Sequence, residues 1–191
     1  IASAQWEELK TRTLQMTKAY HEKFPLRGGI PREELKSRLK INAKLFNAML
    51  KKLFGAKVLE ARAKSVAEST HRIEFGSSEQ AKIHALMRRF EQNPFSPPTV
   101  KESQKEVGEE IFNALIERGE LISFSAEIAF RKPDYEKAVE IIKAYLAKKG
   151  KITVAETRDL LGTSRRYVLA LLENLDSAGI TKREGDFRVL R

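Results

Sequence analysis

The sequence contains no cysteine, which excludes disulfide bonds, thiolate metal sites and cysteine nucleophiles. Histidine is scarce as well: His21, His71 and His84 lie far apart, and no carboxylates stand near them at metal-ligand spacing. We therefore expect no metal and no cofactor in this chain. A cysteine-free chain also fits a reducing compartment, so we expect it to be cytoplasmic.

Long apolar runs are missing too. The longest, Tyr167–Leu172, has six residues, whereas a membrane span needs about 20. No signal peptide opens the chain, and we expect no membrane partner. The first residue is Ile1 rather than Met, so we expect a fragment of a longer protein. No G-x-x-x-x-G-K-[ST] phosphate loop occurs, and we expect no enzymatic activity from this chain.

Positive charge is abundant but unevenly distributed. The net charge is +10, from 36 Lys and Arg against 26 Asp and Glu. Residues 1–75 carry 16 basic against 8 acidic side chains, residues 76–132 carry 8 against 9, and residues 133–191 carry 12 against 9. The two ends are therefore basic around a neutral middle, which favours an anionic partner such as nucleic acid. The alternative is a charged surface that only keeps the protein soluble.

A loose threefold repeat runs along the chain. Each copy has an amphipathic helix, a short capped helix, a third helix ending near a glycine (Gly55, Gly119 or Gly179) and then alternating residues. Helix, helix-turn-helix and hairpin together predict a winged helix. The predicted fold class is mainly α with small β-hairpins (α+β), in three tandem winged-helix domains. Their predicted bounds are 1–75, 76–132 and 133–191, and we expect a monomer because no dimerisation helix is evident.

The last copy shows the pattern most clearly. Thr153 and Glu156 have the spacing of a capping box, Gly162 makes a tight turn, and Thr163 or Ser164 caps the third helix. A hairpin is predicted from 180–183 and 187–191, with Gly185 at its tip. In the other copies Pro31, Asn42, Ser78 and Thr99 mark helix starts, and the predicted hairpin strands are 58–61 with 72–75, and 121–124 with 128–130.

The start of the last copy's third helix has the chemistry of an RNA contact. Hydroxyls, guanidinium groups and an aromatic ring can hold phosphates and stack on unpaired bases. These candidates are Thr163, Ser164, Arg165, Arg166 and Tyr167, joined by Lys182, Arg183 and Arg188 of the hairpin. Four of them have a structural alternative: Tyr167 as core, Ser164 as a cap alone, and Arg165 and Arg166 as solvated charges. The middle copy instead opens its third helix with Glu109 and Glu110, which repel phosphate, so we expect it to be a spacer.

Particular segments resemble one family. Residues 152–169 (ITVAETRDLLGTSRRYVL), 171–176 and 181–189 resemble the last winged helix of bacterial SelB, the selenocysteine-specific translation elongation factor. Residues 21–27 (HEKFPLR) and 32–35 (REEL) resemble the family's second winged helix. The three domains would then be the second, third and fourth of the family's four winged helices.

The resemblance implies a function and a set of contacts. The family's GTP-binding core, which would lie outside this chain, delivers selenocysteyl-tRNA to the ribosome. The last winged helix binds an mRNA hairpin (SECIS) beside a UGA codon. Contacts implied for this chain are Ser164, Arg165, Arg166, Lys182 and Arg183, with Tyr167 and Arg158 in support.

Other possibilities stay open from the residues alone. A winged helix can also place its third helix in the major groove of DNA as a transcriptional regulator, or serve as a protein-binding scaffold. The basic first domain could bind RNA without sequence preference or be solvated only. Its candidate contacts are Lys44, Lys51, Lys52, Lys57, Arg62 and Lys64.

Overall fold

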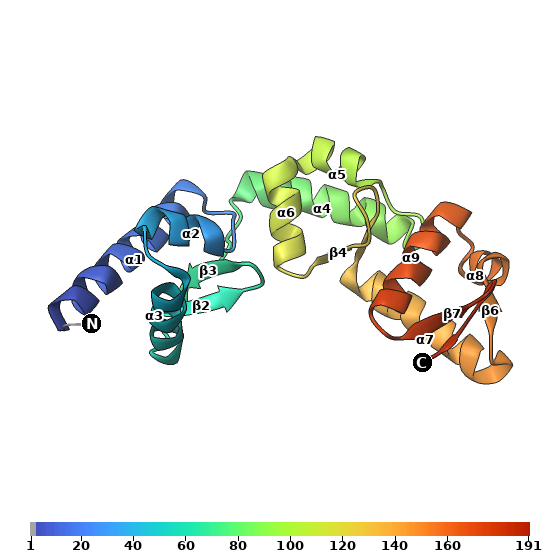
Figure 1. Cartoon of the computed structure of the whole chain (residues 1–191). Helices are drawn as coiled ribbons and strands as arrows, with labels where there is room; N and C mark the ends of the chain where they lie inside the picture. Colours follow the sequence, from blue (N-terminus) through green and yellow to red (C-terminus); the bar gives the residue numbers. More distant parts are fainter. Residues whose placement is uncertain (1–2) are drawn as a thin grey trace. The chain divides into compact units, whose positions relative to one another are not determined.

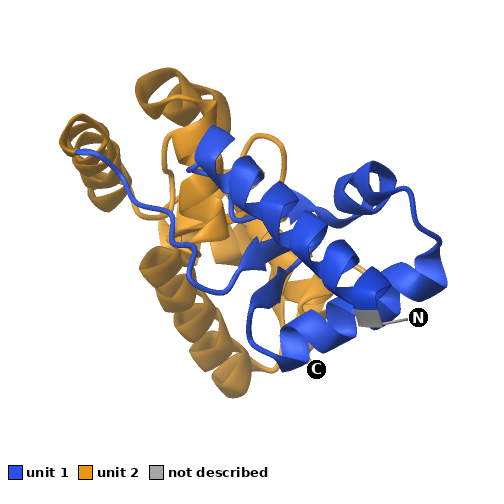
Figure 2. Cartoon of the chain, turned by 90° about the vertical axis from the view of Figure 1, so that its left-hand side faces the viewer, with its two compact units in different colours: residues 1–76 blue, residues 77–191 orange. Residues whose placement is uncertain are grey.

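The computed structural model describes residues 3–191 (Figure 1). The chain forms two compact units, unit 1 from residue 1 to 76 and unit 2 from residue 77 to 191 (Figure 2). The predicted fold class is confirmed: helices dominate, and small antiparallel sheets complete each unit. In the described part of the chain, no helix combines the length and apolarity needed to cross a membrane.

Unit 1 is a winged helix with a three-stranded antiparallel sheet in the order β1-β3-β2. Its apolar core includes Phe46, Met49 and Leu50 from the third helix, which pack with residues of the first helix and the sheet. Gly29 lies so close to the Val66 backbone that no side chain fits there, because a Cβ at this position would be 2.4 Å from the Val66 carbonyl oxygen. Its elements are α1 (Ser3–Lys23), β1 (Ile30–Pro31), α2 (Arg32–Leu39), α3 (Ala43–Gly55), β2 (Leu59–Arg62) and β3 (Ser65–Glu68).

The predicted hairpin of unit 1 was wrong in its second strand. The chain turns back at once through Ala63 and Lys64, so β3 occupies 65–68 and residues 72–75 form no strand. The left-handed residue after α3 is also Lys57 (φ 55°) rather than Gly55, which is the last residue of the helix. Asn42 does cap α3, accepting a hydrogen bond of 2.9 Å from the Leu45 amide. Pro31 precedes α2 instead of being its first residue.

Unit 2 joins two helix-turn-helix assemblies, each with its own sheet. The first has α4 (Ser77–Gln92), α5 (Val100–Val107), α6 (Glu109–Glu117), β4 (Leu121–Ser123) and β5 (Ala129–Arg131). The second has α7 (Lys132–Lys149), β6 (Ile152–Thr153), α8 (Val154–Leu161), α9 (Arg165–Ser177), β7 (Thr181–Glu184) and β8 (Phe187–Leu190). The strand order of the second sheet is β6-β8-β7, whereas β4 and β5 form a two-stranded sheet. We call these assemblies the middle and the last winged helix.

Local signals in unit 2 were confirmed. Thr153 and Thr99 both form capping boxes with the glutamate three residues later. Gly119 and Gly179 adopt left-handed backbone conformations just past α6 and α9, as expected of residues in the C′ position. Helix α4 begins at Ser77, one residue earlier than the cap predicted at Ser78.

The core of the last winged helix extends into the middle one. Buried residues of α7 and α9, such as Ile142 and Leu172, form its centre. Phe95, from the segment between α4 and α5, and Phe124, from the β4–β5 hairpin, pack against it from the middle winged helix. Shared apolar packing therefore makes unit 2 a single body.

Candidate nucleic-acid interface

The turn between α8 and α9 sets the start of the third helix of the last winged helix. Gly162 adopts φ 60° at the end of α8, and its amide donates to the Asp159 carbonyl. Helix α9 then begins at Arg165, with Ser164 as the residue before it. The Ser164 side chain makes no capping hydrogen bond and is exposed, so its hydroxyl is available to a ligand.

Arg165 is the predicted contact whose side chain is most available to a ligand. Its side chain is exposed, and within residues 3–191 it forms neither an ion pair nor a hydrogen bond. Ser164 and Arg165 therefore present a hydroxyl and a guanidinium side by side at a helix start, where backbone N–H groups favour anions.

Thr163 and Tyr167 are committed to the middle winged helix. The Thr163 hydroxyl donates to the Phe95 carbonyl, and the Ser96 hydroxyl lies 2.8 Å from it. The Tyr167 hydroxyl donates to the Pro97 carbonyl at 2.6 Å, and its ring lies 6.3 Å from that of Phe130. Both side chains are partly buried. They therefore fix the start of α9 against residues 95–97, and both hydroxyls are engaged in that contact.

Arg166 lies at the edge of the same contact. Its guanidinium is 3.7 Å from the Glu127 carboxylate in the β4–β5 hairpin and 5.6 Å from the centre of the Tyr167 ring. The side chain nevertheless remains 48% exposed. Because an exposed ion pair contributes little, Arg166 can exchange Glu127 for phosphate at small cost.

The hairpin of the last winged helix divides its cations between two roles. Arg188 is 3% exposed and pairs with the Asp176 carboxylate of α9, so this predicted contact is unavailable to RNA. Arg183, which lies opposite Arg188 in the strand pair, is exposed, and its guanidinium donates to the Gly185 carbonyl at 3.0 Å. Lys182 is exposed and pairs with Glu184 on the same strand at 3.1 Å. Arg158 is exposed too, with its guanidinium on Asp159.

One exposed aromatic residue, Phe187, was not among the contacts predicted from the sequence. The Phe187 ring on β8 is 36% exposed, and the Lys151 ammonium lies 4.3 Å from its centre. An aromatic flanked by a cation suits a stacked base. No local signal in the sequence pointed to it, because Phe187 becomes exposed only when its neighbour Arg188 turns inward to Asp176.

Capping carboxylates near this site stay ionised. Hydrogen bonds from the Thr153 hydroxyl and backbone hold the pKa of Glu156 below its usual value. Thr99 lowers the pKa of Glu102 in the same way. Both carboxylates cap helix starts, Glu102 that of α5 and Glu156 that of α8.

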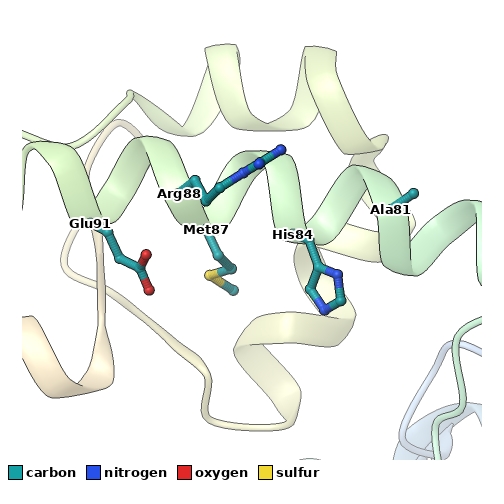
Figure 3. A pocket seen from close by; sticks show the side chains of 5 residues that line it. All are labelled: Ala81, His84, Met87, Arg88 and Glu91. Carbon is teal, nitrogen blue, oxygen red and sulfur yellow. The ribbon is translucent and has the colours of Figure 1, made fainter.

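Two further features lie outside the last winged helix. In unit 1, the stacked rings of His21 and His71 have centroids 3.6 Å apart, and burial, followed by the charges of His71 and Arg62, lowers the pKa of His21 to about 4. On α4, Ala81, His84, Met87, Arg88 and Glu91 line a pocket (Figure 3). Its exposed walls carry both signs of charge, so we assign it no ligand.

Of the six lysines and arginines predicted as contacts in unit 1, one is structural. Arg62 is partly buried and donates to the carbonyls of Gly28 at 3.1 Å and His71 at 2.7 Å. Lys52 lies over the Trp6 ring, 4.7 Å from its centre. Lys44, Lys51, Lys57 and Lys64 are exposed.

Comparisons with known proteins agree with this geometry. Two family models, each described as elongation factor SelB, winged helix, match residues 14–67 and 144–190, together just over half of the chain. A selenocysteine-specific elongation factor from Desulfomicrobium baculatum is 27% identical over 181 residues, which are 90% of this chain and 28% of that protein. The chain thus spans little more than a quarter of the length of this relative.

Solved structures share the fold. The mRNA-binding domain of elongation factor SelB from E. coli, in complex with SECIS RNA, superposes with a TM-score of 0.51 at 23% identity, over 61% of this chain and 99% of that one. A bacterial selenocysteine-specific elongation factor, EF-Sec, superposes with a TM-score of 0.59 at 20% identity, over 99% of this chain and 30% of that one.

Proposed function

This chain belongs to the SelB family as part of its winged-helix region, and from that premise we propose that its last winged helix binds a SECIS-type mRNA hairpin beside a UGA codon. The observation that carries the proposal is the start of α9. The side chains of Ser164 and Arg165 are exposed there, and within residues 3–191 neither side chain forms a hydrogen bond or an ion pair. The similar E. coli domain was solved in complex with SECIS RNA.

The chemistry of this surface suits a hairpin loop better than a duplex. The deep, narrow groove of A-form RNA hides its base edges, so a protein reads sequence from splayed loop and bulged bases. The guanidinium planes of Arg165 and Arg166 can stack on such bases, while Arg183 and Lys182 of the β7–β8 hairpin reach the phosphates. The middle winged helix contributes indirectly, because its residues 95–97 hold the start of α9 through Thr163 and Tyr167.

The remaining assignments concern the whole factor. We propose that the ribosome and selenocysteyl-tRNA are partners of the full-length protein in the cytoplasm. GTP would be held in the part of the factor that this chain does not span. The chain itself would act as a binding module without catalysis.

An arginine substitution tests the proposal. In the full chain, Arg165→Ala should weaken binding of a labelled SECIS hairpin by about 1–3 kcal/mol, because a stacked or bidentate arginine is lost. Fluorescence anisotropy measures the affinity, and duplex DNA of the same sequence tests the alternative of a DNA regulator. Arg88→Ala, which removes an exposed arginine from α4 of the same unit, is the matched control. Unchanged affinity for the hairpin in Arg165→Ala, or an equal loss in Arg88→Ala, contradicts the proposal.

A further inference from the structure

The third helix of unit 1 exposes a basic face. Lys44, Asn47 and Lys51 are spaced three and four residues apart, so they lie on one side of α3, and all three are exposed. The opposite side of the helix, including Phe46 and Leu50, is buried in the core. Within residues 3–191, neither lysine is paired with a carboxylate.

An arginine from the neighbouring helix extends this face. Arg32, the first residue of α2, donates to the Asn47 side-chain carbonyl at 2.9 Å. Its guanidinium also lies 5.5 Å from the centre of the Phe46 ring, which holds the group beside α3. Because the Asn47 oxygen already accepts this hydrogen bond, its amide NH₂ is left to donate outward. The face therefore offers donors and positive charge.

The other third helices differ in charge. Helix α6 opens with Glu109 and Glu110, and α9 carries Glu173 and Asp176. Helix α3 has no acidic residue between Ala43 and Gly55. The third helix is the element that a winged helix places against nucleic acid. The most uniformly basic third helix of the chain is thus in unit 1, which plays no part in the hairpin contact proposed above.

We infer that the α3 face, made of Lys44, Asn47, Lys51 and Arg32, binds the sugar–phosphate backbone of double-helical RNA without sequence preference. Lys44 and Lys51 are about 10 Å apart along the helix axis, so they engage separate phosphates of one backbone. The amide of Asn47 between them matches a 2′-hydroxyl, which accepts hydrogen bonds and is exposed in the shallow groove of A-form RNA. Lys57 and Lys64 add positive charge near the hairpin of unit 1.

The test uses the full chain and a blunt RNA duplex that has neither loop nor bulge. Anisotropy titrations at several KCl concentrations give the slope of log affinity against log salt, which reports the number of phosphates engaged. The double variant Lys44→Ala with Lys51→Ala should bind more weakly and lose about two from the steepness of this slope. The matched control, Arg12→Ala with Lys18→Ala, removes the same charge from exposed positions of α1 and should retain the wild-type slope.

Three outcomes overturn the inference. The first is no duplex binding by the wild-type chain at low salt, and the second is equal slopes in the two double variants. The third is that poly-L-glutamate displaces the labelled duplex as effectively as unlabelled duplex does, when the two competitors are added at equal total charge. That result would make the face a site for acidic protein. The duplex has neither loop nor bulge, and its readout is the salt slope of the unit 1 variants rather than the affinity of Arg165→Ala for the hairpin. The duplex and hairpin titrations can therefore fail separately, and failure of one proposal is distinguishable from failure of the other.

Discussion

The hairpins of the two compact units each fix one arginine by its guanidinium, and the two arginines differ in burial and in their partners. In unit 1, Arg62 donates to the backbone carbonyls of Gly28 and His71 and also forms an ion pair with the partly exposed Glu60 carboxylate. In unit 2, Arg188 is almost fully buried and relies on the Asp176 carboxylate. The arginine of unit 2 is thus buried against the Asp176 carboxylate, whereas that of unit 1 divides its guanidinium between a partly exposed carboxylate and two neutral carbonyls.

Unit 1 instead buries a neutral histidine. His21 is 6% exposed and accepts a hydrogen bond from the Glu68 amide through Nε2, while Nδ1 finds no hydrogen-bond partner among residues 3–191. A proton added to this buried ring would create a positive charge that is poorly solvated and is repelled by His71 and Arg62. The comparison therefore predicts that unit 2 is sensitive to loss of an anion, and unit 1 to gain of a proton.

Removal of the anion in unit 2 should have the largest effect. Asp176→Ala leaves the buried Arg188 guanidinium unpaired and also removes the acceptor of the Thr181 hydroxyl. We expect a loss of about 3 kcal/mol in the free energy of unfolding, measured by urea denaturation followed by circular dichroism. Arg183 lies opposite Arg188 in the strand pair but is exposed, so Arg183→Ala should change the free energy of unfolding by less than about 0.5 kcal/mol. Similar losses in the two variants would show that Asp176 does not balance a buried charge.

Acidification should destabilise unit 1 next most strongly. The pKa of His21 is about 4 in the folded protein and 6.5 unfolded, so the unfolded state binds more protons between these values. The stability contributed by neutral His21 is therefore complete above pH 6.5 and falls as the pH drops toward 4, by up to about 3 kcal/mol. Urea unfolding followed by Trp6 fluorescence reports this unit, because Trp6 is the single tryptophan and packs on its core.

Two variants isolate this histidine. His21→Gln keeps an acceptor near the Glu68 amide but cannot titrate, so it should flatten the pH dependence between 6.5 and 4. His84→Gln, at the exposed histidine of α4, should leave the Trp6 transition unchanged. A wild-type slope in His21→Gln would assign the pH dependence to other groups.

The smallest effect concerns the contact within unit 2. Tyr167→Phe removes only the hydroxyl that donates to the Pro97 carbonyl, and we expect a loss of about 1 kcal/mol in stability. Tyr145→Phe removes a hydroxyl bonded to exposed Glu156 and should cost less, since water replaces that partner readily. Equal costs would indicate that residues 95–97 are hydrated rather than packed on α9.

Local features of this fold could be predicted because their causes are local. The capping box of Thr153 and Glu156, the cap at Asn42 and the turn at Gly162 each depend on residues within one helical turn. The second strand of unit 1 was misplaced because alternation over residues 72–75 resembled a strand, while the true partner of β2 follows a two-residue turn.

The candidate site could be predicted only in part. The exposure of Ser164 and Arg165 follows from their place at a helix start. The burial of Arg188 depends on Asp176, twelve residues earlier, and the binding of Tyr167 depends on a carbonyl 70 residues away. Such partners are set by tertiary packing, so no pattern in the neighbourhood of either residue distinguishes a structural side chain from an RNA contact.

The hydrogen bonds that fix α9 to the middle winged helix have an evolutionary consequence. Thr163 and Tyr167 both donate to main-chain oxygens, those of Phe95 and Pro97. A carbonyl is present whatever side chain the residue carries. Substitutions at residues 95 and 97 would then require no compensating change at 163 or 167 to preserve these bonds. Methods that infer contacts from correlated substitutions should therefore detect these two bonds poorly, whereas the side-chain contacts beside them, such as Ser96 with Thr163 and Phe130 with Tyr167, remain open to detection.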